Sequence, residues 1–110
     1  MKLSNDIAVI SLTHWDREWR FPFEKTRMLL VDMMDELLDT LERMPEYTCF
    51  HLDGQTVLLE DYCEVRPENE GRLRALVEAG RLLIGPWYSL PEENQVSGES
   101  LVRNFLWGER

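Results

Sequence analysis

A histidine and an aspartate two residues apart, His14 and Asp16, are the first residues in the chain whose types could do chemistry together. On an extended segment, side chains at this spacing point the same way. An imidazole and a carboxylate on one side make half of a divalent-metal site, and further ligands must come from elsewhere because two cannot hold zinc firmly. The plainer interpretation is a histidine hydrogen-bonded to its neighbour. The only other histidine, His51, lies within an expected strand and is interpreted as a satisfied core or edge residue.

Two adjacent carboxylates, Glu92 and Glu93, form the second candidate, shortly after Trp87 and Tyr88. Aromatic faces stack on the apolar face of a sugar ring, while carboxylates meet its hydroxyls. Glycoside cleavage with retention needs a nucleophilic carboxylate and an acid partner about 5 Å away. The alternative interpretation is a solvated pair of glutamates in a loop.

An alternation of strands and helices would position both candidates. The continuous apolar run at residues 7–12 predicts a strand buried on both faces, and residues 47–52, ended by Asp53-Gly54, and 81–84 predict two more. Apolar residues at spacings of three and four predict a helix over 23–44. Acidic residues off its apolar face are predicted to be solvated: Asp32, Asp35, Glu36, Asp39 and Glu42.

Three more helices are predicted, over residues 56–63, over 67–79 with Gly80 as the stop, and after Ser97 as N-cap, with an apolar face at Leu101, Val102, Phe105 and Leu106. The element order then favours an α/β fold, with a parallel sheet and crossover helices. No repeat or linker divides the chain.

Both candidates follow the carboxyl ends of predicted strands. Residues 13–19 come after the first strand and residues 85–94 after the third, and together they hold three of the four tryptophans. Ligands of α/β folds sit at this end of the strands. The position therefore favours a ligand pair at His14 and Asp16. The alternative is that the tryptophans cap the end of the sheet.

Composition limits the classes of partner. The chain has 110 residues, enough for one domain, with 44% apolar and 30% charged residues. Its 12 basic and 21 acidic residues give a net charge of −9, which argues against nucleic acid or an anionic membrane as partner. Residues 1–6 lack the apolar core of a signal peptide, and Cys49 and Cys63 make no disulfide framework. We therefore expect a cytoplasmic protein.

The segment His-Trp-Asp-Arg-Glu-Trp at residues 14–19 resembles the amino-terminal metal motif of glycoside hydrolase family 38, the retaining, zinc-dependent α-mannosidases. Further blocks resemble bacterial members in the same order, among them Phe-His-Leu-Asp-Gly-Gln at 50–55, Ile-Gly-Pro-Trp-Tyr at 84–88 and Val-Ser-Gly-Glu-Ser-Leu-Val-Arg-Asn at 96–104. The resemblance covers nearly the whole chain. It is strongest to the bacterial branch that includes mannosylglycerate hydrolases.

The resemblance implies a seven-stranded parallel β/α barrel, of which residues 1–110 would be the first three β/α units. It implies that His14, Asp16 and Glu92 hold zinc or another divalent metal, and that Glu92 is the nucleophile. Trp19 would lie under the sugar. Trp87 is expected to be a second substrate contact for a different reason, because its ring lies on the same loop as Glu92 and could stack on the sugar. The substrate would be an α-mannoside or a related small glycoside. The remaining metal ligand and the general acid would lie in later segments of the same catalytic domain. The expected partner of residues 1–110 is therefore the rest of that domain. Association into a homo-oligomer is a further possibility.

One departure concerns the nucleophile, because the family has aspartate where this chain has Glu92. The extra methylene moves the carboxylate by roughly 1.5 Å, and a misplacement near 1 Å costs on the order of a hundredfold in rate. A non-catalytic sugar-binding or interaction module is therefore a second hypothesis. A third is another metal-dependent hydrolase, such as a deacetylase or amidohydrolase, which the absence of a His-x-His motif disfavours.

Overall fold

Short parallel strands alternate with helices along the chain. The computed structural model describes residues 6–110, and its elements are β1 (Ser11–Leu12), α1 (Phe23–Arg43), β2 (Phe50–His51), α2 (Val57–Val65), the 3₁₀ turn η1 (Pro67–Asn69), α3 (Glu70–Glu78), β3 (Leu82–Leu83) and α4 (Gly98–Gly108). The sheet order is β1-β2-β3, with both pairs parallel. The predicted α/β fold with a parallel sheet is thus confirmed. The seven-stranded barrel stays a prediction, as does the assignment of residues 1–110 to one domain. Residues 1–5, where the sequence shows no signal-peptide core, lie outside the described part.

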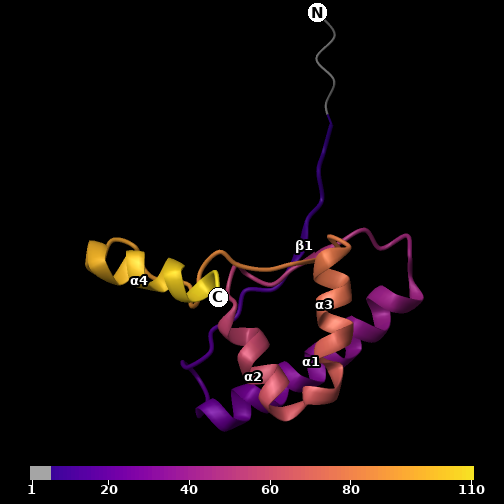
Figure 1. Ribbon diagram of the computed structural model, residues 1–110, viewed down its shortest axis with the longest axis horizontal. Coiled ribbons are helices and arrows are strands. Elements are labelled where there is room, and N and C mark those ends of the chain that lie inside the picture. Colours follow the sequence, from indigo (N-terminus) through magenta and orange to yellow (C-terminus); the bar gives the residue numbers. More distant parts are fainter. Residues whose placement is uncertain (1–5) are drawn as a thin grey trace, which may run out of the picture.

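The strands are much shorter than the apolar runs that predict them, and the expectation of a strand buried on both faces at residues 7–10 is wrong. Ile7 and Val9 are each 88% exposed, and this segment extends away from the rest of the molecule (Figure 1). The register explains the difference. Ser11 pairs with Phe50, the first residue of β2. Among the described residues, no strand therefore continues far enough to pair with residues 7–10.

The core lies between α1, α2 and α3, which gather on one side of the sheet (Figure 1). The spacing of three and four that predicts α1 places its apolar side chains on one face, and Met34, Leu38 and Leu41 are fully buried there. α2 adds Leu58 and Tyr62, with no exposed surface on either. In residues 6–110, no helix is both long and apolar enough to span a membrane.

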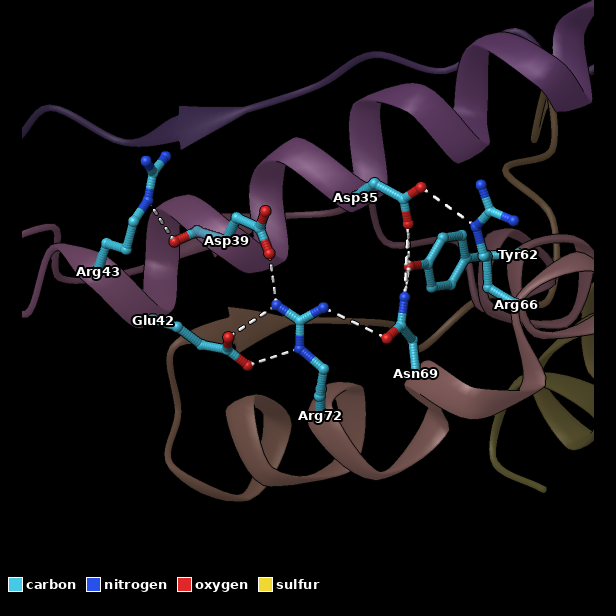
Figure 2. Close-up of polar contacts among 8 residues, drawn as sticks. All are labelled: Asp35, Asp39, Glu42, Arg43, Tyr62, Arg66, Asn69 and Arg72. Carbon is cyan, nitrogen blue, oxygen red and sulfur yellow. Dashed lines mark hydrogen bonds and ion pairs between the residues drawn. The ribbon is translucent and has the colours of Figure 1, made fainter.

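A polar network joins α1 to the following helices (Figure 2). Four of the five acidic residues predicted to be solvated are exposed, but three of the five also bind side chains of later segments: Asp35, Asp39 and Glu42. The Tyr62 hydroxyl donates to Asp35 at 2.6 Å, and Arg66 Nε donates to the same carboxylate at 3.2 Å. Arg72 of α3 donates to Asp39 at 2.6 Å and to Glu42 at 2.8 Å. Burial, reinforced by its hydrogen bond to Asp35, raises the pKa of Tyr62 to about 12.

The last helix begins and packs differently from the others. Ser97 Oγ accepts the backbone N–H of Ser100 at 3.2 Å, which confirms the predicted N-cap. None of the residues of α4 is buried, and Val102 and Leu106 are more than half exposed. The helix lies apart from the other three (Figure 1). Its predicted apolar face is therefore left largely open in the described part of the chain.

Candidate functional site

The loops that follow β1 and β3 meet at one hollow of about 350 Å³. This confirms the expectation that these two segments lie together at the carboxyl ends of the strands. The lining comes from the loop after β1, the turn after β2 and the loop after β3: His14, Trp15, Asp16, Arg17, Glu18, Gln55, Ser89, Leu90, Pro91 and Glu92. Glu92 therefore shares a cavity with the His14–Asp16 pair, whereas Glu93 does not line it.

The imidazole of His14 lies between two carboxylates. Its Nδ1 is 3.0 Å from Asp53 Oδ2, and its Nε2 is 3.5 Å from Asp16 Oδ1. The side chains of His14 and Asp16 are 65% and 46% exposed, whereas that of Asp53 is only 12% exposed. Asp53 therefore contacts the imidazole on its Nδ1 side, and Nε2 lies toward Asp16, which lines the hollow.

A tight turn after β2 carries Asp53 and Gln55 into the site. Asp53 and Gly54 both have a positive φ, of 49° and 68°, a conformation that aspartate and glycine tolerate better than most residues. The sequence predicts that the strand ends at this turn, but no pattern in it indicates that Asp53 or Gln55 belongs to a functional site. Asp-Gly after a strand is a turn signal, and that signal does not reveal which loop the side chains will contact.

Arg17 anchors the loop after β1 to α2. Its Nε donates to Asp61 Oδ2 at 2.6 Å and its second terminal nitrogen donates to Asp61 Oδ1 at 2.9 Å. The guanidinium also lies 4.3 Å from the centre of the Phe23 ring. The hydrogen bond to Asp61 raises the pKa of Arg17, so the guanidinium stays charged. Asp61, 7% exposed at its side chain, is a supporting residue that spacing in the sequence does not reveal.

The two tryptophans expected to contact substrate lie outside the residues that line the hollow. Trp19 is 67% exposed, with the Arg20 guanidinium 4.5 Å from its ring centre. The ring of Trp87 stacks on Phe105 of α4, with 3.9 Å between centroids. Trp15 lines the hollow instead. The substrate roles of Trp19 and Trp87 stay predictions.

The donor set fits part of a metal site. With bonds of about 2.0–2.1 Å, a nitrogen and an oxygen bound to one tetrahedral zinc would be roughly 3.4 Å apart. The Nε2 of His14 and Oδ1 of Asp16 are 3.5 Å apart. Over residues 6–110, no group of three metal-ligating side chains is assembled. The chain therefore presents two suitably spaced donors, with Glu92 on the same hollow but not joined to them.

Comparison with known families decides the membership of the chain. Residues 4–110 match the model of the glycosyl hydrolases family 38 N-terminal domain. The chain belongs to glycosyl hydrolase family 38. The match extends over nearly all of the sequence, so the resemblance inferred from the motifs of this family 38 chain is confirmed.

Relatives of this family 38 chain include a protein named as a mannosylglycerate hydrolase and one named as an alpha-mannosidase. It is 49% identical over 100 residues to a putative mannosylglycerate hydrolase of Halalkalibacterium halodurans, covering 91% of the chain and 11% of that protein. It is 30% identical over 99 residues to an alpha-mannosidase of Saccharomyces cerevisiae, covering 88% of the chain and 9% of that protein. The chain thus spans about a tenth of the length of these relatives.

Solved structures agree with this membership. The crystal structure of an alpha-mannosidase from Enterococcus faecalis V583 superposes with a TM-score of 0.86 at 48% identity, covering 90% of the chain and 11% of that structure. A second family 38 protein from Enterococcus faecalis has a TM-score of 0.81 at 44% identity, with the same coverage. The backbone of the family 38 chain is therefore similar to the corresponding tenth of these two solved structures.

Proposed function

We propose that the chain is the amino-terminal part of a catalytic domain that hydrolyses terminal α-mannosyl linkages with retention, using a divalent metal, zinc first among them. The observation that carries the proposal is the shared hollow, which brings His14, Asp16 and Glu92 together from two loops. Family membership and the mannosidase names of the relatives support the substrate class. A seven-stranded barrel, a cytoplasmic location and a role in mannose catabolism belong to the same proposal.

In this mechanism, each residue on the hollow has a separate task. His14 Nε2 and Asp16 would hold the metal, which, when bound, supplies a positively charged template for sugar hydroxyls. A carboxylate oxygen of Glu92 forms a bond to the anomeric carbon as the bond to the leaving group breaks, and water later releases the sugar from Glu92. The leaving oxygen takes its proton from a general acid, which we expect in a later segment of the same catalytic domain. Arg17, held by Asp61, keeps the loop of His14 in place.

The surroundings of Glu92 can accommodate a side chain that is one methylene longer than the aspartate expected at this position. Glu92 is exposed, so its extra methylene meets no packed wall that would fix the carboxylate in one place. The names of the relatives, a putative mannosylglycerate hydrolase and an alpha-mannosidase, suggest two substrate classes for this chain. Both contain the α-mannosyl unit on which Glu92 would act.

A non-catalytic sugar-binding module is the second candidate. Its supporting observation is that the described residues assemble no three-ligand metal group, while glutamate stands at the expected aspartate position. Such a module would bind mannosides without turnover. Activity measurements on the full-length protein distinguish the two.

The test removes the two metal donors one at a time. In the full-length protein, we expect His14→Ala and Asp16→Ala each to lose bound metal and hydrolysis of an aryl α-mannoside together, because each deletes a ligand. Metal content is measured by mass spectrometry of purified protein, and activity by release of the aryl group. Glu93→Gln is the matched control, because it lies off the hollow, and keeps both. Full metal occupancy in both alanine variants would refute the assignment.

A further inference from the structure

The turn after β2 holds the two site loops through one compact set of contacts. Asp53 Oδ2 accepts the backbone N–H of Trp15 at 2.9 Å and Nε2 of Gln55 at 3.1 Å, and it lies 3.0 Å from Nδ1 of His14. Gln55 Nε2 also donates to the Trp15 carbonyl at 2.9 Å, and Gln55 Oε1 accepts the backbone N–H of Leu90 at 3.2 Å. One carboxylate and one amide thus contact both loops that line the hollow.

The carboxylate of Asp53 determines which nitrogen of the His14 imidazole is available to bind a metal. A negative charge beside Nδ1 favours the tautomer with its proton on Nδ1, so the lone pair remains on Nε2. Nε2 is the nitrogen that faces Asp16 and the hollow. A carboxylate behind a ligating histidine fixes both its tautomer and the orientation of its ring.

The amide of Gln55 fixes the spacing between the loops. Gln55 is 4% exposed, so its hydrogen bonds are shielded from water. Its donor end binds the loop of His14 and Asp16, and its acceptor end binds the loop of Glu92, two residues after Leu90. Glutamate at this position would have the same shape. It would lose the donor and would place a second carboxylate against Asp53.

We propose that Asp53 and Gln55 are positioning residues of the site: Asp53 orients His14 toward the metal, and Gln55 sets the distance from the metal donors to Glu92. The proposal rests on the metal-dependent activity proposed above. It adds two residues, from a third segment of the chain, that touch neither substrate nor metal.

The test measures metal affinity separately from turnover in the full-length protein. Zinc affinity is obtained by competition with a chromophoric chelator, and ligand geometry from the visible absorption spectrum after substitution with Co²⁺. For Asp53→Asn we expect zinc binding about tenfold or more weaker and an altered cobalt spectrum. For Gln55→Glu we expect a fall in kcat larger than any change in KM. Asp35→Asn, which removes a carboxylate from the network of Figure 2, is the matched control and leaves zinc affinity unchanged.

The outcomes separate this inference from the proposed function. Wild-type zinc affinity and an unchanged cobalt spectrum in Asp53→Asn would overturn the role of Asp53, while the wild-type protein still bound zinc through His14. Unchanged kcat in Gln55→Glu would overturn the role of Gln55. If the wild-type protein bound no zinc, the metal site itself would fail, and the positioning role would fall with it. If Asp35→Asn lost as much zinc affinity as Asp53→Asn, the loss in both variants would be explained by general destabilisation of the fold. That result would refute the positioning role of Asp53.

Discussion

Glu92 is the residue on which the proposed chemistry depends. It lines the hollow with His14 and Asp16, whereas its neighbour Glu93 does not. In active full-length protein, we expect a mechanism-based mannosidase inhibitor to form its covalent bond with Glu92, because this carboxylate faces the same cavity as the metal donors. Peptide mass mapping after proteolysis locates the label.

Glu92→Gln and Glu93→Gln are the matched pair for this experiment. Glutamine keeps the shape of each side chain but cannot attack the anomeric carbon. The first variant loses labelling and the second keeps it. Label on Glu93 would contradict the assignment, and so would label on a residue outside this chain.

Tyr62 predicts a dependence of stability on alkaline pH. Its pKa is about 12 in the folded protein against 10.0 for the free group, with burial as the main cause. The folded state therefore favours the neutral phenol. The stabilisation is complete below about pH 10 and is lost as the pH rises through 12, a difference on the order of 3 kcal/mol for two pKa units. Between pH 9 and 11.5, the unfolding free energy of Tyr62→Phe should fall less steeply than that of wild type in urea titrations. Parallel curves would exclude this role for Tyr62.

Sequence spacing identifies some residues of the site and misses others. His14 and Asp16 are two residues apart in the sequence, and Glu92 stands at a position of the family motif, so local patterns are enough to name these three residues as candidates. Asp53 and Gln55 contact Trp15 across 38 and 40 residues. Those contacts depend on the register that pairs Ser11 with Phe50. The sequence does not encode this register in any local pattern.

At the scale of the element, α1 supplies the largest share of the core. Leu38 is fully buried among the helices, whereas Leu29 on the same helix is 45% exposed. Leu38→Ala should lower the unfolding free energy by about 3 kcal/mol, because it leaves a cavity. Leu29→Ala, the matched control, should cost less than about 0.5 kcal/mol. Urea unfolding of the two variants gives the difference; equal effects would mean that α1 does not pack as described.

The helices could be predicted better than the strands for a physical reason. The periodicity of α1 and the cap at Ser97 are local signals, and both are confirmed. A strand needs a partner of matching length. β2 has only two residues, so the longer apolar run before β1 finds nothing to pair with among residues 6–110. The periodicity of α4 likewise predicts its apolar face, which lies largely open among the described residues.

The molecule is more extended than a compact domain of the same number of residues. Its radius of gyration is 15.8 Å, whereas a compact domain of this size would have about 13 Å. The excess comes from the segment before β1 and from α4, which both project from the three-helix core (Figure 1). Large apolar side chains are exposed on the segment before β1, on β1 itself and on α4: Ile7, Val9, Ile10, Leu12, Val102, Phe105, Leu106 and Trp107.

This distribution predicts how the 110-residue chain behaves when it is produced alone. β1 forms one edge of the described sheet, and its residue Leu12 and the preceding Ile10 are exposed. Exposed apolar edge strands pair with other chains, whereas charges at an edge prevent this. We therefore expect concentration-dependent self-association in analytical ultracentrifugation, and substantially less association for the Ile10→Lys, Leu12→Lys double variant. Hydrogen exchange should show protection in α1 to α3 and little in residues 7–12 and α4, because the helices of the first group carry most of the buried side chains and no residue of 7–12 or of α4 is buried. A monomer with strong protection throughout would mean that these apolar surfaces pack within one chain, contrary to the arrangement described.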